Sequence, residues 1–244
     1  MSTALSGLAD VPVWCSWSGG KDSALALHET MQAGAEPRFL VAMLTEGGER
    51  SRSHGLSREL LAAQAAAVGL PIRFGAATWA GYREELLRVM GEGAAGSGAR
   101  AGVFGDIDMD DHREWEEAIC AEVGMEAVLP LWHRDRRAVI DQLLAAGFEA
   151  VIVAVRDGVL PPSLLGRTLD AGAVAEIEAA GADACGENGE FHTFVVNGPI
   201  FQRAVEVEVG RAALRDGVWF VDLLPRSAQA ATSAMAMWPP DSRR

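Results

Sequence analysis

The feature that most constrains this chain is the turn SGGKDS, residues 18–23, which joins an apolar run to a helical pattern. The run VPVWCSW, residues 11–17, is typical of a buried strand, and apolar residues recur with helical spacing from Asp22 to Ala33. A strand, a glycine-containing turn and a helix start together form a phosphate site, because backbone N–H groups and the helix dipole converge there. Glycines let the backbone approach the anion closely.

This turn differs from two common nucleotide-binding motifs. Cys15 and Asp22 stand where GxxxxGK[ST] requires Gly and Ser or Thr, and GxGxxG does not fit the turn either. Lys21 is the only lysine among the 244 residues. Its ammonium is compact and differs in donor geometry from a guanidinium. The sequence therefore indicates a phosphate-binding turn of another kind, and the alternative is a glycine-rich turn without a ligand.

Composition excludes several classes of protein. The net charge of −13 argues against binding a nucleic-acid backbone, although a local pocket could still hold a small anion. No apolar run approaches the roughly 20 residues of a membrane span, and the N-terminus lacks a secretory pattern. The three cysteines, Cys15, Cys120 and Cys185, include no CxxC pair. We expect a cytoplasmic protein without nucleic-acid or membrane partners, and a homodimer is left open.

Strand and helix patterns alternate in the first half of the chain. Strands are predicted at 11–17, 38–44, 70–76, 101–106 and 127–132, and helices at 22–33, 57–68, 81–90 and 111–123. Asp111 and Glu114 suggest a capping box at the start of the last helix, and the Gly/Ala-rich segment 91–102 suggests a mobile connection. This alternation predicts an α/β fold with a parallel sheet.

The pattern changes after about residue 129. Helices are predicted at 136–146 and 171–180, and strands at 148–155, 191–196, 203–209 and 217–224. This order predicts a smaller α+β domain. We therefore expect a domain that contains the phosphate-binding turn at 1–129, the α+β domain at 130–226 and a disordered tail at 227–244.

A second motif lies in CGENGEFHTFVV, residues 185–196. Two carboxylates, Glu187 and Glu190, alternate with glycines, and His192 and Thr193 open the next predicted strand. Taken alone, this stretch is typical of a polar β-turn. Together with SGGKDS, however, it resembles the diphthine–ammonia ligase-like group of the PP-loop ATP pyrophosphatases, which are adenine nucleotide alpha hydrolase-like proteins. The resemblance continues through 53–56, 60–72, 112–136 and 143–155, and so covers most of residues 11–210.

The resemblance implies a fold and an activity. The fold would be a parallel-sheet, HUP/Rossmann-like PP-loop domain followed by a smaller α+β domain. The activity would be an AMP-forming ligase that uses ATP and Mg²⁺ to activate a carboxylate, and then forms an amide with ammonia. An acyl-adenylate makes a poor electrophile reactive, and the pyrophosphate loop with Mg²⁺ would stabilise the developing charge.

The resemblance also implies roles for individual residues. The pyrophosphate would be surrounded by Ser18, Gly19, Gly20, Asp22 and Ser23. Lys21 would neutralise its charge, and Asp22 would reach Mg²⁺. Glu187 and Glu190 would orient the substrate or the amine, with Thr193 beside them, while Asn188 and His192 would contact the group being amidated. Met43 lies where such enzymes receive adenine, and His54 in SHGL is a candidate ligand contact.

Two departures from the family pattern bear on the substrate. The pattern Glu-Gly-Gly-Glu, aromatic, Glu appears here with Asn188 for the middle Gly and His192 for the last Glu. Diphthine carries a trimethylammonium group, which a carboxylate attracts more strongly than a neutral His does. In addition, the fourth strand ends in Gly105-Asp106 where Gly-Ala is expected. We expect that the ATP chemistry is kept and that the substrate is not diphthine.

A third stretch, GDIDMDDHREWEE, is rich in acidic residues. Asp106, Asp108, Asp110 and Glu117 have calcium-loop spacing, but Asp111 replaces the required glycine, so a helix start capped by Asp110 or Asp111 is the preferred interpretation. Asp106 follows a parallel strand, where open α/β sheets bind ligands, whereas His112 is expected at the surface or as a cap.

Two alternatives for the whole chain stay open. One is a PP-loop sulfur transferase acting on tRNA, for which Cys185 is the candidate cysteine. The other is a nucleotide-binding module without catalysis.

Overall fold

The computed structural model describes residues 5–226, and the predicted tail at 227–244 lies outside them. Its N-terminal part is a five-stranded parallel sheet with strand order β3-β2-β1-β4-β5. The strands are β1 (Pro12–Ser16), β2 (Glu36–Leu44), β3 (Ile72–Ala76), β4 (Ala101–Val103) and β5 (Glu126–Val128). The α/β class predicted from the sequence is confirmed.

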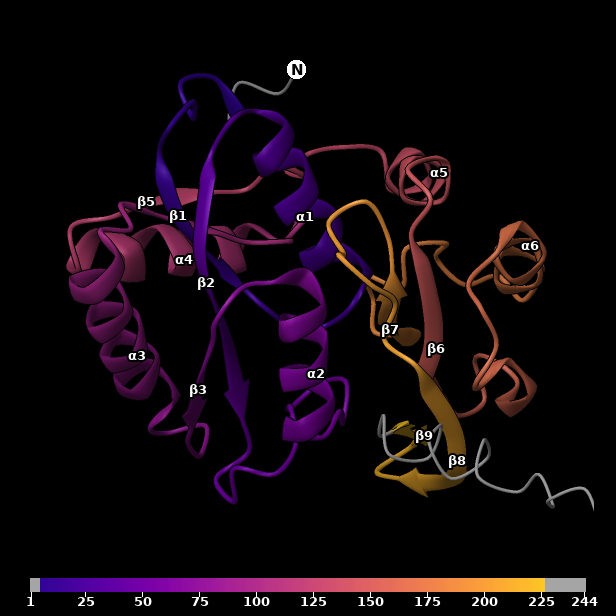
Figure 1. The fold of residues 1–244 in the computed structure, drawn as a ribbon. Helices are drawn as coiled ribbons and strands as arrows, with labels where there is room; N and C mark the ends of the chain where they lie inside the picture. Colours follow the sequence, from indigo (N-terminus) through magenta and orange to yellow (C-terminus); the bar gives the residue numbers. More distant parts are fainter. Residues whose placement is uncertain (1–4, 227–244) are drawn as a thin grey trace, which may run out of the picture.

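Helices cover both faces of this sheet (Figure 1). They are α1 (Lys21–Gln32), α2 (Arg58–Val68), α3 (Tyr82–Ser97) and α4 (Asp110–Glu122). Successive residues of β1 point to opposite faces, as strand geometry requires. Val13 and Cys15 pack in the cluster with α1 and α2, whereas Trp14 packs with Leu86 of α3 and Ile119 of α4.

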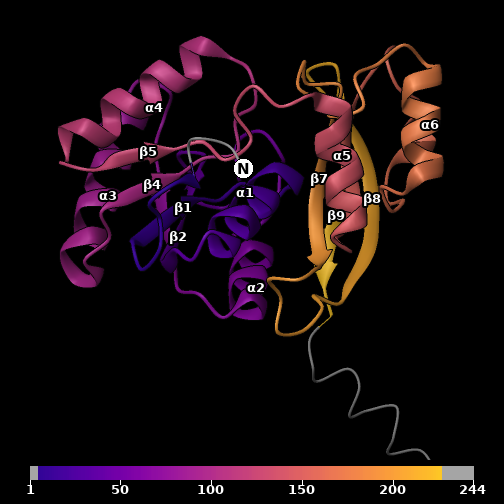
Figure 2. The ribbon, with the colours of Figure 1, turned by 90° about the horizontal axis from the view of Figure 1, so that it is seen from above.

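The C-terminal part is a four-stranded antiparallel sheet with strand order β7-β6-β9-β8. Its elements are α5 (Arg136–Ala145), β6 (Glu149–Arg156), a 3-10 turn (Pro162–Leu164), α6 (Ala171–Ala179), β7 (Phe191–Asn197), β8 (Val207–Arg215) and β9 (Val218–Pro225). Helices α1 and α2 lie between this sheet and the parallel one, and α6 lies on its other side (Figure 2). The predicted α+β organisation is confirmed.

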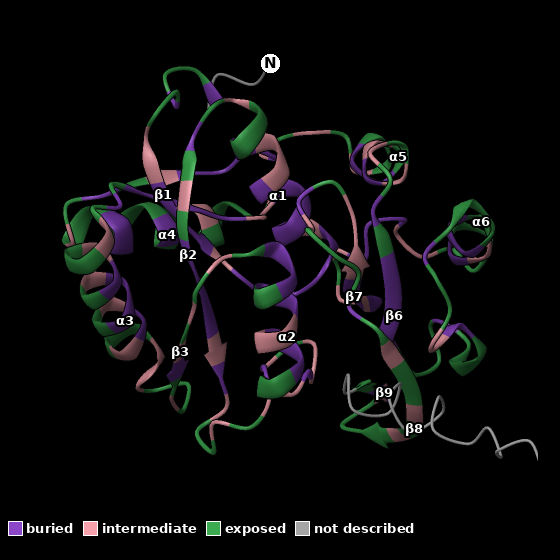
Figure 3. Ribbon diagram, in the orientation of Figure 1, coloured by how far each residue is buried: buried purple, intermediate pink, exposed green. Residues whose placement is uncertain are grey.

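One hydrophobic core joins the two sheets. Leu25 of α1 and Leu61 of α2 belong to the same buried cluster as Ile152 of β6 and Phe194 of β7. The buried residues therefore continue from β1 through α1 and α2 into β6 (Figure 3). Because apolar burial is the main favourable term in folding, each part of the chain stabilises the other.

Several sequence predictions of element boundaries are wrong. Helix α3 continues to Ser97, so most of the Gly/Ala-rich segment 91–102 is helix and not a mobile connection. Helix α4 begins at Asp110 after the N-cap Met109, and no side-chain cap forms, so the capping box at Asp111 is absent. The strand predicted at 203–209 begins at Val207 and runs to Arg215. The fifth strand ends at Val128 instead of 132.

Among the described residues, no helix combines the length and apolar character needed to cross a bilayer.

Two glycines of α3 provide a test of its length. A Cβ added to Gly91 would meet no neighbouring atom within 4 Å, whereas Gly98 ends the helix with φ +73°. We expect Gly91→Ala to raise the free energy of unfolding by about 0.5–1 kcal/mol, because Ala favours a helix interior. Gly98→Ala should lower it by about 1 kcal/mol. Urea denaturation measures both, and equal small effects would indicate a mobile segment after all.

Candidate active site

The turn at 18–23 is braced by its own side chains. Gly20 is the N-cap of α1, and its N–H donates to Ser18 Oγ at 3.2 Å. The hydroxyl of Ser23 donates to the Gly20 carbonyl at 3.1 Å and lies 3.1 Å from Ser18 Oγ. These hydrogen bonds fix the shape of the turn at the start of helix α1, where the helix dipole favours an anion.

Glycine is required in this loop because neighbouring groups lie against it. Gly19 has φ +80°, and a Cβ there would lie 2.8 Å from Leu61 Cδ2. A Cβ on Gly20 would collide with the ring of His54. A third glycine, Gly105 after β4, approaches the same helix start, since a Cβ on it would lie 2.8 Å from the carbonyl carbon of Asp22. Close packing thus explains these glycines without any ligand.

Strand β7 of the second sheet completes the loop. The Lys21 N–H donates to Thr193 Oγ1 at 3.1 Å, and the Val195 N–H donates to the Gly19 carbonyl at 2.9 Å. The buried Gln64 amide of α2 donates to the carbonyls of Gly19 and Val195 at 3.0 Å and 2.6 Å. The turn at 18–23 is therefore built by both parts of the chain.

Lys21 is buried between two carboxylates. Its Nζ lies 2.6 Å from Asp22 Oδ2 and 3.7 Å from Glu187 Oε1, and it is 5.6 Å from the centre of the Phe191 ring. Burial opposes the charge of Lys21, but Asp22 and Glu187 outweigh it and raise the Lys21 pKa. Burial and the charge of Asp22 raise the pKa of Glu187 to about 8. A proton is thus readily exchanged at Glu187 near neutral pH.

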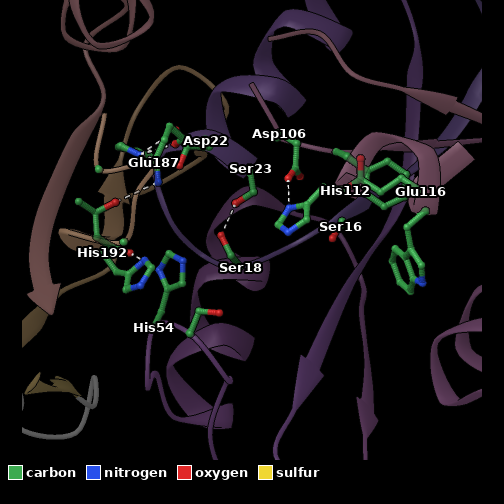
Figure 4. A pocket seen from close by; sticks show the side chains of 18 of the residues that line it. Ser16, Ser18, Asp22, Ser23, His54, Asp106, His112, Glu116, Glu187 and His192 are labelled. Atoms are coloured by element: carbon green, nitrogen blue, oxygen red, sulfur yellow. Dashed lines mark hydrogen bonds and ion pairs between the residues drawn. The ribbon is translucent and has the colours of Figure 1, made fainter. Parts of the chain in front are cut away.

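Two histidines face the loop from the two parts of the chain. His54 and His192 have ring centres 4.6 Å apart, and Figure 4 shows them side by side. His54 Nδ1 lies 2.8 Å from the Thr193 carbonyl; because a carbonyl only accepts, Nδ1 carries the proton and Nε2 is an acceptor in the neutral ring. Burial lowers the pKa of both rings, and for His192 the neighbouring His54 adds to this effect.

The acidic residues of the second predicted motif, residues 185–196, have two different positions: one lies at the cavity, and the other holds the turn of the motif. Glu187 lines the cavity. Glu190 is buried and accepts hydrogen bonds from the backbone N–H of Asp183 and from the N–H and side-chain amide of Asn188. Neither Glu190 nor Asn188 is among the cavity-lining residues. Their contacts indicate that they hold the turn that carries Glu187.

A cavity of about 740 Å³ connects this loop with helices α3 and α4. Ser18, Lys21 and Glu187 lie at one end, and Tyr82, Trp115 and Glu116 line the other. Among the predicted residues, Asp22, Ser23, His54, Asp106, His192 and Thr193 also line it. Its volume lies within the range of small-molecule sites.

Other predicted residues lie differently. The side chain of Met43, the proposed adenine neighbour, packs by Gly75 of β3, and Met43 is not among the cavity-lining residues. His112, expected at the surface or as a cap, is exposed, yet its Nδ1 lies 2.8 Å from Asp106 Oδ1 and it lines the cavity. Asp108 of the calcium-like pattern is bound instead to Arg136 at 2.7 Å.

Sequence reasoning missed the end of the cavity at α3 and α4. No motif in the sequence points to Tyr82 and Trp115, whose ring centres are 5.9 Å apart, or to Glu116. A signal exists in the helix periodicity. His112, Trp115 and Glu116 are spaced i, i+3, i+4, which places them on one side of a helix. That side follows Asp106, the predicted ligand-facing residue.

Comparison with known proteins agrees with this arrangement. The models of the diphthamide synthase N-terminal domain and C-terminal domain match residues 12–127 and 135–223. The chain belongs to the diphthamide synthase family. These two matches correspond to the parts that contain the parallel and the antiparallel sheet.

Curated relatives of the family are named diphthine–ammonia ligase. The chain is similar to the Rattus norvegicus protein (28% identical over 134 residues, 53% of this chain and 49% of that protein). It is similar to the Danio rerio protein (30% over 111 residues, 43% and 42%) and to the Homo sapiens protein (29% over 128 residues, 51% and 47%). The chain thus spans about half the length of the curated relatives it matches.

The contact between Lys21 and Thr193 generates a prediction. Thr193→Val keeps the shape but leaves the buried Lys21 N–H without its acceptor, so we expect the free energy of unfolding to fall by about 1–3 kcal/mol. Thr193→Ser keeps the hydroxyl and serves as the matched control, with a smaller loss. Chemical denaturation at constant pH measures both variants. Equal losses would show that the hydroxyl does not support the loop.

Proposed function

We propose that this chain is an ATP-dependent ligase that adenylates a substrate carboxylate and forms an amide with ammonia, releasing AMP and pyrophosphate. One observation carries the proposal. The turn at 18–23 follows a strand of the parallel sheet, and Glu187 precedes a strand of the antiparallel sheet. The two meet around one buried ammonium group, that of Lys21. Such a site can hold a polyphosphate next to a second reactant. The names of the relatives support the ligase activity.

The loop supports bond cleavage between the α- and β-phosphates of ATP. The substrate carboxylate would attack the α-phosphorus, form an acyl-adenylate and release pyrophosphate. Backbone N–H groups at 18–23 and the Lys21 ammonium would stabilise the negative charge that develops on the leaving pyrophosphate. Because Lys21 is buried, its charge acts through little water and is effective there.

The donor atoms near Lys21 fit Mg²⁺ better than a softer metal. Asp22, Cys185 and Glu187 place one donor atom each within 4.8 Å of one another. Burial raises the pKa of the Cys185 thiol, whose Sγ donates to the Arg136 carbonyl at 3.1 Å. The two carboxylates remain, and Mg²⁺ prefers oxygen ligands. Of the two, Asp22 would hold the ion, which would neutralise phosphate charge, because the raised pKa of Glu187 keeps that carboxyl available for proton exchange.

The neutral histidines and Glu187 would act on the amine. Ammonia is present mostly as ammonium at neutral pH and must lose a proton before it attacks the acyl-adenylate. His54 Nε2 is an acceptor beside the loop, and Glu187 has a pKa raised to about 8 by burial and by Asp22. These groups are poised to accept that proton.

The acceptor acid is proposed to differ from diphthine. His192 takes the position of the last Glu in the family pattern, and burial keeps its ring neutral. A neutral ring attracts a trimethylammonium group less than a carboxylate does. The sulfur-transfer alternative is not favoured, because the buried thiol of Cys185 is held protonated.

The reaction itself is the first test. We expect ATP to yield AMP and pyrophosphate when Mg²⁺, ammonium and a panel of carboxylic acids are supplied, measured by chromatography of nucleotides and by mass spectrometry of amides. Formation of ADP, or tight ATP binding without turnover, would favour a different class of protein. Efficient amidation of diphthine-modified elongation factor 2 would overturn the substrate proposal alone.

Replacement of Lys21 tests the role of its ammonium. Lys21→Arg keeps the charge but brings a larger planar group into a place that is 5% exposed between Asp22 and Glu187. We expect AMP formation to fall at least tenfold (about 1.4 kcal/mol in the barrier). Arg38→Lys, at an exposed ion pair with Glu36, is the control and should change nothing. Full activity of the Lys21 variant would contradict the proposed role.

A further inference from the structure

The turn that carries Glu187 is held by a carboxylate that is not among the cavity-lining residues. Asp183 precedes this turn, and its side chain is 13% exposed. Its Oδ1 accepts from the Cys185 N–H and its Oδ2 accepts from the Glu187 N–H, both at 3.1 Å. An aspartate that accepts from backbone N–H groups a few residues later fixes the shape of a turn. Asp183 therefore sets where the backbone of Glu187 lies.

The carboxyl of Glu187 depends on this backbone for its position. Glu187 Oε1 lies 3.7 Å from Lys21 Nζ, which is longer than a hydrogen bond. The Glu187 side chain lines the cavity and is 15% exposed. A shift of the turn would therefore move this carboxyl relative to the phosphate loop, because no short contact with Lys21 holds it in place.

One guanidinium joins Asp183 to a third segment of the chain. Arg136 is the first residue of α5, and its Nη1 lies 2.8 Å from Asp183 Oδ2. Its Nε and Nη2 donate to the two carboxylate oxygens of Asp108, both at 2.7 Å. Such a two-bond pair fixes the plane of the guanidinium as well as its distance from the carboxylate. Asp108 therefore orients Arg136 toward Asp183.

Asp108 connects this contact with the wall of the cavity. It lies two residues after Asp106, which lines the cavity between β4 and α4. A hydrogen bond from Arg136 lowers the pKa of Asp108, so this carboxylate is ionised at neutral pH. The backbone of Arg136 adds a further bond, because its carbonyl accepts from Cys185 Sγ at 3.1 Å. The loop after β4, the start of α5 and the turn before β7 thus meet at one residue.

We propose that Arg136 is a positioning residue, which holds Glu187 at the cavity through Asp183 and is itself anchored by Asp108. Arg136 is not among the cavity-lining residues, so it acts on the reaction through the turn. The inference rests on the proposed function, in which Glu187 accepts a proton from ammonium. Loosening the turn would displace this proton acceptor and leave the phosphate loop intact. The acidic stretch 105–117 thereby gains a role other than binding calcium.

Labelling of cysteines tests the inference without any substrate. All three cysteines are free and buried, with Cys15 in β1, Cys120 in α4 and Cys185 in the turn. Arg136→Lys keeps the positive charge but loses the two-bond pair with its anchor. We expect N-ethylmaleimide to label Cys185 roughly tenfold faster in this variant and the other two thiols at an unchanged rate, as measured by mass spectrometry of peptides. A general loss of stability would instead expose all three thiols together.

A matched control lies at the next position of the chain. Arg137→Lys changes an exposed arginine that pairs with Glu178, and it should leave the labelling of every cysteine as in the wild type. Asp108→Asn removes the charge of the anchor in a loop, and it should also speed the labelling of Cys185. This second variant decides the matter if Arg136→Lys does not fold. Wild-type labelling of Cys185 in either folded variant would overturn the proposed role.

The ligase reaction tests whether Arg136 acts through Glu187. We expect Arg136→Lys to lower kcat for amide formation roughly tenfold and to change KM for ATP by less than about twofold, because the phosphate loop is untouched. Combined with Glu187→Gln, it should cause no further loss beyond that of Glu187→Gln alone, since its effect requires the carboxyl group. Additive losses would show that Arg136 acts by another route and would overturn the inference.

These measurements separate the inference from the proposed function. Selective labelling of Cys185 together with additive kinetic losses would leave the ligase activity intact and overturn the positioning of Glu187. If no acid is amidated, the proposed function fails, and the role in proton transfer fails with it. Labelling of Cys185 would still decide whether Arg136 holds the turn.

Discussion

The backbone of the turn at 18–23 is held by strand β7, and the rest of the site depends on this contact. The Gly19 carbonyl accepts from the N–H of Val195 and from the amide of Gln64, while the Lys21 N–H donates to Thr193. Each of these groups is buried, so a missing partner would be costly. The shape of the turn therefore belongs to the two sheets jointly, and not to the strand-turn-helix unit alone.

Charge in the site follows from the same arrangement. Strand β7 and the turn before it bring Glu187 close to Lys21. Lys21 already forms an ion pair with Asp22, its neighbour in helix α1. Burial raises the pKa of Glu187, and the charge of the second carboxylate, Asp22, adds to this effect. A polyphosphate or a cation entering here would change these protonation states, so binding and proton transfer are coupled.

The spacing of apolar residues and the positions of glycines predicted most of the fold. The parallel sheet, its helices and the antiparallel second part agree with apolar patterns that glycines interrupt. The failures have local causes. The segment after Met90 contains several glycines, yet Gly93 sits against the Phe39 ring and the helix continues, because tertiary packing outweighs propensity. The predicted range of strand β8 is wrong because exposed and partly buried residues do not alternate regularly along this strand.

The site was predictable where a motif carried it. The turn SGGKDS was predicted from its own residues and Glu187 from the resemblance to a known family, and both line the same cavity. Glu190 and Asn188 could not be separated from Glu187 by sequence, since only the structure shows that they bond to each other within the turn. The end formed by Tyr82, Trp115 and Glu116 depends on how the successive helices α3 and α4 are placed on the sheet, which no motif in the sequence shows. Because β7 supplies main-chain bonds to the turn and the sheets share one core, any motion that swings the two halves apart would break the hydrogen bonds that shape the turn at 18–23.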